Sequence, residues 1–133
     1  MENIIKTVNE IKHNKTYILF GCTGSRDRSK RPIMMQLALN NSSFVFVTSD
    51  DLHEEKFEDI VKDMLENNSQ KHYLVEKDRG VAIKMAISKM SNDDILLILG
   101  KGHEEVIIIG NSRIPFNDKK EVLNVIQEKV VIN

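Results

Sequence analysis

The chain has 133 residues, and its 19 Lys and Arg against 20 Asp and Glu give a formal net charge of −1 at pH 7. This length supports one domain with a real hydrophobic core, and the near-neutral charge argues against nucleic acid as a partner. Cys22 is the only cysteine, which excludes an internal disulfide and a cysteine metal cluster. No apolar run is long enough to span a bilayer, and the first residues lack the pattern of a signal peptide. We therefore expect a cytoplasmic protein with no membrane partner.

Hydrophobic periodicity divides the chain into alternating helices and strands. Apolar residues at helical spacing predict helices, and continuous apolar runs between turn residues predict strands that are covered on both faces. In chain order, we predict a helix over 4–11, a strand over 16–20, a helix over 33–39, a strand over 44–48, a helix over 57–65, a strand over 72–75, a helix over 79–90, a strand over 95–99, a hairpin of 106–109 and 113–116, and a last helix after 117 or 118.

This alternation predicts the fold class. Strands that alternate with helices are typical of an α/β fold, here a Rossmann-like, doubly wound and mostly parallel sheet with helices on both faces and one antiparallel edge strand. Pro32 suits the first turn of the second helix, in which Met34, Leu37 and Ala38 should face inward, and Asp78 should cap the fourth. We expect residues 1–133 to form a single domain.

Three predicted loops, 21–32, 49–54 and 100–105, follow the carboxyl ends of strands. In a parallel sheet these ends meet at one edge, which is where ligands bind. The first loop is basic, the second is acidic and the third combines both signs with glycine. The charged residues concerned are Arg26, Arg28, Lys30 and Arg31 with Asp27 in the first loop; Asp50, Asp51, Glu54 and the adjoining Glu55 in the second; and Lys101, His103 and Glu104 beside Gly100 and Gly102 in the third. Such a mixture suits a zwitterionic ligand such as an amino acid.

The basic loop allows two interpretations. It is either a solvated surface loop or an anion site in which Arg26 or Arg31 offers a planar fork to a carboxylate or phosphate. The third loop is equally open, because His103 beside Glu104 is either an acid–base pair or a hydrogen-bonded loop histidine.

Several common motifs are absent from the sequence. The glycines do not form the dinucleotide fingerprint, and there is no phosphate-binding loop of the G-x-x-x-x-G-K-[ST] form, so no complete ATPase site is visible. The histidines lack metal-ligand spacing, which gives no expected metal site. Cys22 has no identifiable catalytic partner and is expected to be a small packed residue.

Two long motifs resemble the C-terminal domain of the Mur ligases, most closely the MurE type, the UDP-N-acetylmuramoyl-tripeptide synthetases. The family pattern G-C-G-G-D-R-D-x-G-K-R-P appears as G-C-T-G-S-R-D-R-S-K-R-P over 21–32, and G-K-G-H-E appears unchanged over 100–104. The stretches over 107–110 and 114–118 also resemble the end of the family's domain. The resemblance covers nearly the whole chain.

The resemblance implies a function and a set of site residues. It implies an ATP-dependent ligase that adds an amino acid to a UDP-muramoyl dipeptide, with ATP and Mg held mainly by a central domain that is absent here. Arg26 matches the arginine that grips the amino-acid carboxylate, and Gly100 and Glu104 match positions at the distal, amine-bearing end of diaminopimelate. No catalytic residue is expected in this domain. The partners would be the amino acid, the UDP-muramoyl peptide and the other Mur ligase domains.

The sequence departs from the family where specificity is set. Residues 50–53 replace D-N-P-R with Asp50-Asp51-Leu52-His53, and the D-Y-A-H-T-P-D segment that leads into this domain is missing. An imidazole is mostly neutral at pH 7 and lacks the fork of an arginine. His53 and its acidic neighbours should therefore favour lysine, or another amino acid with a distal amine, over meso-diaminopimelate, unless Lys30 or Arg31 supplies the missing cation.

Three hypotheses therefore remain from the sequence. The first is the amino-acid-binding domain of a ligase, either excised from a longer protein or a natural stand-alone domain. The second is a non-catalytic binding module for an amino acid or anionic metabolite. The third is a generic nucleotide-binding domain of Rossmann-like fold.

Overall fold

A six-stranded sheet forms the centre of the molecule, with the strand order β3-β2-β1-β4-β5-β6. The computed structural model describes residues 1–24, 27–99, 105–109 and 112–115. The strands are β1 (Thr16–Phe20), β2 (Phe44–Val47), β3 (Tyr73–Val75), β4 (Ile95–Leu99), β5 (Glu105–Ile109) and β6 (Ser112–Pro115), and the helices are α1 (Glu2–Asn9), α2 (Lys30–Asn40), α3 (Phe57–Met64) and α4 (Arg79–Lys89). The last predicted helix, after residue 117, lies outside the described residues.

The predicted parallel sheet is confirmed for β3, β2, β1 and β4, which pair in parallel. The antiparallel part is larger than expected. Strand β5 runs antiparallel to β4 and lies one position in from the edge, and β6 pairs antiparallel with β5 and forms the edge. The reason is chain length, because residues 100–104 are too few for the crossover of about a dozen or more residues that a parallel strand requires.

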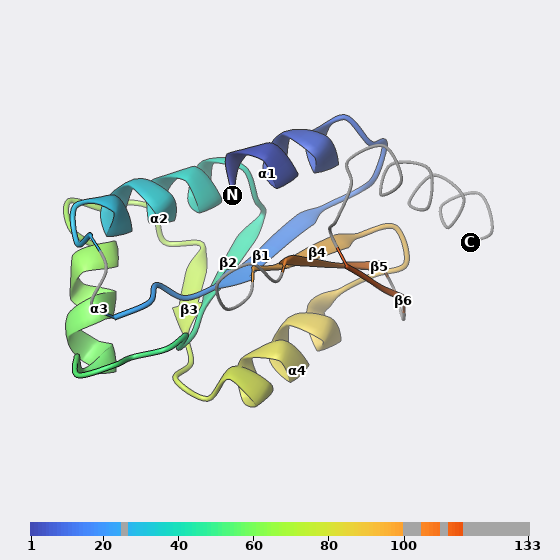
Figure 1. Cartoon of the computed structure of the whole chain (residues 1–133). Coiled ribbons are helices and arrows are strands. Elements are labelled where there is room, and N and C mark those ends of the chain that lie inside the picture. The colour runs from blue at the N-terminus through green and yellow to red at the C-terminus, as the bar shows by residue number, and fades with distance from the viewer. Residues whose placement is uncertain (25–26, 100–104, 110–111, 116–133) are drawn as a thin grey trace.

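Helices cover both faces of the sheet, as Figure 1 shows, with α1 and α2 on one side and α4 on the other. Two separate hydrophobic clusters match this arrangement, because alternate strand residues point to opposite faces. The larger cluster packs α1, α2 and α3 against one face, and the smaller packs Ala82 and Ala86 of α4 against Tyr17, Leu19 and Phe46. All five residues of β1 and of β4 are buried, as expected for strands covered on both sides.

Helix α2 begins earlier than predicted, while Met34, Leu37 and Ala38 pack in or against the larger cluster as expected. Its buried residues are Arg31, Met35, Ala38 and Leu39, whereas Met34 and Leu37 are only half-buried. The spacing of four, seven and eight residues from Arg31 is that of one helical face. The first residue of this buried face is therefore a cation, Arg31, and its side chain points into the fold.

The predicted N-cap of α4 is confirmed, since the backbone N–H of Val81 donates to Asp78 Oδ1 at 3.1 Å. This helix begins where β3 ends, so its N-terminus lies at the carboxyl edge of the parallel strands. Among the described residues, no helix combines the length and apolar composition needed to cross a bilayer.

Candidate functional site

The first two loops meet at the carboxyl edge of the sheet, as their positions in the sequence predicted. The backbone N–H of Gly24 donates to Asp51 O at 2.7 Å, and Thr23 Oγ1 donates to Asp50 Oδ2 at 3.3 Å. Glycine is required for this approach, because a Cβ on Gly24 would lie 1.9 Å from Leu52 O and one on Gly21 would lie 2.2 Å from Thr48 O. The two glycines that the motif places three residues apart thus allow one loop to rest on the other.

Arg31 lies inside this junction. Its side chain is only 2% exposed, and its Nη1 and Nη2 donate to Glu55 Oε2 at 2.8 Å and Glu55 Oε1 at 2.9 Å. Nη1 also donates to Asp63 Oδ2 at 2.9 Å, and Nη2 to Thr23 O at 3.3 Å. The side chain therefore links the first loop, the end of the second loop and α3.

These contacts bear on two predicted site residues. Both terminal nitrogens of Arg31 are engaged within the fold, and its candidate role as a cation for a ligand stays a prediction. The Glu55 carboxylate is its partner, and the Glu55 side chain is still 27% exposed. The place of Arg31 on the buried stripe of α2 is visible only in the structure, and a cation is tolerated there because it is paired.

Asp63 of α3 accepts from two arginines. Arg28, whose side chain is 71% exposed, donates from Nε at 2.8 Å and from Nη2 at 3.0 Å, and Arg31 donates from the buried side. Hydrogen bonds from Arg28 and then from Arg31 outweigh partial burial and lower the pKa of Asp63 from 3.8 to about 2. The hydrogen bond to Glu55 raises the pKa of Arg31 above its usual range, so this network is fully charged at neutral pH.

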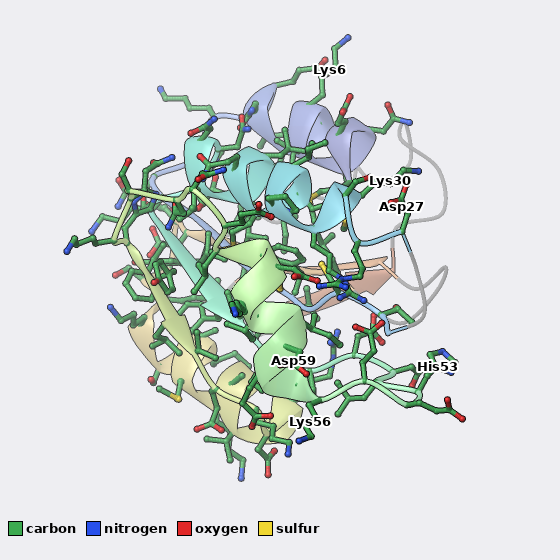
Figure 2. The ribbon with its side chains drawn as sticks, turned by 90° about the vertical axis from the view of Figure 1, so that its left-hand side faces the viewer. Lys6, Asp27, Lys30, His53, Lys56 and Asp59 are labelled. Atoms are coloured by element: carbon green, nitrogen blue, oxygen red, sulfur yellow. The ribbon has the colours of Figure 1, made fainter. Side chains whose placement is uncertain are left out.

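The remaining predicted residues of the first two loops lie at the surface. Asp50 is half-buried, and Asp51, His53 and Lys30 are exposed. Figure 2 shows His53 at the outside of its loop, pointing away from the body of the molecule, whereas Lys30 lies well apart from it, near Asp27. His53 has a φ of 53°, in the left-handed region that most side chains avoid. The backbone N–H of Glu55 donates to Leu52 O at 3.0 Å and closes the turn around it.

Five predicted site residues lie outside the described residues. These are Arg26 in the first loop and Gly100, Lys101, His103 and Glu104 in the third. Their roles remain predictions.

Arg79 is a residue at this edge that the sequence did not single out. Its Nη2 donates to Leu99 O, at the end of β4, at 2.9 Å, and its Nη1 donates to Ser49 O, after β2, at 3.2 Å. It therefore ties the start of the second loop to the strand that leads into the third. The available signal was its place directly after the N-cap Asp78, at the carboxyl end of a parallel strand.

Cys22 is buried, and this burial raises the pKa of its thiol to about 11, despite the opposing charge of Arg31. The thiolate needed of a nucleophile is therefore scarce at neutral pH, which fits the packed role expected for this residue. Among the described residues, no group of three or more His, Cys, Asp or Glu is placed to hold a metal ion.

Comparison with known proteins defines the class. The family described as "Mur ligase, glutamate ligase domain" matches residues 1–102, which is more than half of the chain. The chain therefore belongs to this family, the C-terminal domain of the Mur ligases, as its motifs indicated.

The relatives narrow the class to the MurE type. The chain is 39% identical over 132 residues to a UDP-N-acetylmuramoyl-L-alanyl-D-glutamate–2,6-diaminopimelate ligase of Oceanobacillus iheyensis, covering 97% of this chain and 27% of that protein. It is 42% identical over 126 residues to the ligase of the same name from Clostridioides difficile, covering 93% of this chain and 26% of that protein. A solved structure with this title has a TM-score of 0.70 at 36% identity and covers 96% of this chain and 27% of that one. The chain thus spans about a quarter of the length of these relatives.

Proposed function

We propose that residues 1–133 form the amino-acid-binding domain of an ATP-dependent MurE-like ligase. The reaction is amide formation between an amino acid and a UDP-N-acetylmuramoyl dipeptide, in the cytoplasm, during peptidoglycan synthesis. The observation that carries the proposal is the junction of the first two loops at the carboxyl edge, where Gly24 donates to Asp51 O at 2.7 Å. This junction brings Thr23 and Gly24 of the first motif against Asp50 and Asp51, in the segment that replaces D-N-P-R.

In this proposal the domain positions the amino acid and supplies no catalytic residue. Arg26 grips the carboxylate of the amino acid, while Asp50, Asp51 and His53 face its distal end with Gly100 and Glu104 from the third loop. Lys30, Lys101 and His103 are secondary candidates. Holding the amine beside an acyl phosphate makes the encounter effectively intramolecular. ATP and Mg²⁺, which activate the acyl group, are held mainly by the family's central domain.

We further propose that the amino acid carries a distal amine and that lysine is preferred over meso-diaminopimelate. Diaminopimelate has a second carboxylate, which needs a fixed cation. Arg31 is engaged with Glu55 and Asp63, so of the two alternatives considered Lys30, which is exposed, is the more accessible. The names of the relatives favour diaminopimelate instead. The departure from D-N-P-R at 50–53 is the reason to expect a different preference here.

The test is amino-acid-dependent ADP release by the full-length protein that carries this chain, with lysine and meso-diaminopimelate supplied in turn. Release with lysine at a higher kcat/KM supports both proposals. Release only with diaminopimelate supports the ligase and overturns the lysine preference. A full-length protein that binds an amino acid but releases no ADP with any of them would be a binding module instead. The chain of residues 1–133 by itself should show no ATP turnover.

Arg26 provides a second test. A bidentate guanidinium–carboxylate pair is strong enough that Arg26→Ala should raise the KM for the amino acid by about tenfold or more. Arg26→Lys should restore little, because the planar fork is lost. Equal KM values for the variant and the unchanged protein would make Arg26 a solvated loop residue.

A further inference from the structure

Residue 53 is held in a backbone conformation that it would not adopt by itself. Its φ of 53° is positive, which is uncommon for a residue with a side chain. Such conformations persist only where the surrounding structure enforces them, and they concentrate at functional sites. The question is which contacts enforce this one.

Two contacts bracket the turn that contains His53. On the amino side, Asp51 O accepts from the backbone N–H of Gly24 at 2.7 Å. On the carboxyl side, the Glu55 carboxylate is gripped by the two terminal nitrogens of Arg31 at 2.8 and 2.9 Å. The turn is therefore fixed at both ends to the first loop and the beginning of α2.

The Arg31–Glu55 pair is suited to fixing geometry. A fork-to-carboxylate pair with two parallel bonds sets direction as well as distance. The guanidinium is almost fully buried, and among the described residues its Nε finds no hydrogen-bond partner. A buried ion pair is weak evidence for net stability and is better attested as a device that specifies conformation, so the placement of Arg31 fits a role in fixing the loop.

We propose that Arg31 is a positioning residue, which acts through Glu55 to hold residues 51–55 and the side chain of His53 where the distal end of the amino acid binds. This inference rests on the proposed function for its ligand, and on the hydrogen bonds alone for its geometry. Arg31 touches no substrate in this role. Its effect is the placement of residue 53.

The experiment compares Glu55→Gln with Arg28→Gln in the full-length protein. Glu55→Gln keeps the size of the side chain but removes the charge and one of the two acceptor oxygens. Arg28→Gln is the matched control, because Arg28 bonds the other partner of Arg31, Asp63, and is not bonded to Glu55. Arg31→Lys is the second variant, which keeps the buried charge without the fork.

The first measurement needs no activity. Hydrogen exchange of the Gly24 backbone N–H, which donates to Asp51 O, should be faster by about tenfold in Glu55→Gln, as expected for the loss of one charge-assisted hydrogen bond. It should be unchanged in Arg28→Gln. Equal exchange rates in Glu55→Gln and the unchanged protein would overturn the positioning role, whatever the function of the protein.

The second measurement separates positioning from simple stability. Glu55→Gln and Arg31→Lys should raise the KM for the amino acid by about tenfold, with the KM for ATP unchanged. A purely structural pair would lower the amount of folded enzyme and leave both KM values as they were, which would overturn the inference. No ADP release by the unchanged protein with any amino acid would overturn the proposed function, and with it the assigned ligand, while the exchange measurement would still decide the geometry.

Discussion

A buried charge is stabilised differently at the amino ends and at the carboxyl ends of the parallel strands, which we call the amino edge and the carboxyl edge. At the amino ends of β1 and β4, Asp94 is 1% exposed and accepts from the backbone N–H groups of Lys15 at 3.1 Å and Ser91 at 2.8 Å. At the carboxyl ends, Arg31 is 2% exposed and is satisfied mainly by side chains, those of Glu55 and Asp63. Both charges join segments that are far apart in the sequence: Asp94 accepts from a main-chain donor 79 positions away, and Arg31 donates to side chains 24 and 32 positions away.

This difference supports the proposal that the carboxyl ends of the parallel strands bind the ligand. A carboxylate held by main-chain donors closes a connection and leaves no side chain directed outward. A network of side chains can hold loops of variable sequence in place while their tips stay exposed, as His53 and Lys30 are. Stability and function should therefore respond differently to substitutions at the two edges.

The largest effect is expected for Gly24→Ala at the carboxyl edge. The new Cβ would lie 1.9 Å from Leu52 O and 2.6 Å from Leu52 C, both backbone atoms, so the loops must separate. We expect a loss of about 3 kcal/mol in the free energy of unfolding, measured by urea denaturation, and a higher KM for the amino acid. Gly80→Ala is the control: its Cβ meets only Asp78 Oδ1, at 3.4 Å, and it should stabilise α4 by about 0.5–1 kcal/mol.

Asp94→Ala at the amino edge tests the other half of the comparison. It leaves the N–H groups of Lys15 and Ser91 without their acceptor, which should reduce the free energy of unfolding by about 2 kcal/mol. The KM for the amino acid should not change in the folded protein, because the site lies at the opposite ends of the strands. A changed KM would mean that the two edges are coupled, and the comparison would fail.

Acid should weaken the carboxyl edge through Asp63. Its pKa is about 2 in the folded protein and 3.8 ordinarily, so the unfolded chain takes up the proton first as the pH falls. The stabilisation is complete above pH 4 and is lost as the pH falls from about 4 to about 2. We expect the loss to be about 1.5 kcal/mol, since exposed Arg28 is screened by solvent. Asp63→Asn should remove this part of the pH dependence of the free energy of unfolding. If the variant and the unchanged protein lost the same stability between pH 4 and pH 2, Asp63 would not be the group responsible.

The smallest effect is expected for Asp78→Ala, which removes the cap of α4 from the backbone N–H of Val81. We expect a loss of about 1 kcal/mol in the free energy of unfolding. Asp78→Asn should retain most of the stability, because asparagine caps helices about as well. Comparable losses in the two variants would show that the charge, rather than the hydrogen bond, stabilises this helix.

Much of this architecture follows from the sequence. Apolar runs located β1 and β4 to the residue, because strands covered on both faces need continuous apolar side chains. Asp78 was identified as a cap, since capping is decided by residues three positions apart. Two motifs, over 21–32 and 100–104, indicated the family that comparison then confirmed. The antiparallel direction of β5 could also have been predicted, because the segment between β4 and β5 is too short for a parallel crossover.

The role of Arg31 was decided only by the tertiary structure. In the sequence it is one of four cations in a basic loop, with nothing to separate it from Arg26 or Lys30. The packing of α2 carries position 31 inward, and the packing of α3 brings Glu55 and Asp63 to meet it. Glu55 and Asp63 lie 24 and 32 positions after Arg31 in the sequence. Whether they pair with it depends on how these elements pack together, which local periodicity does not encode. The sequence determined the chemical groups at this edge, and the fold decided which of them bind one another and which stay exposed.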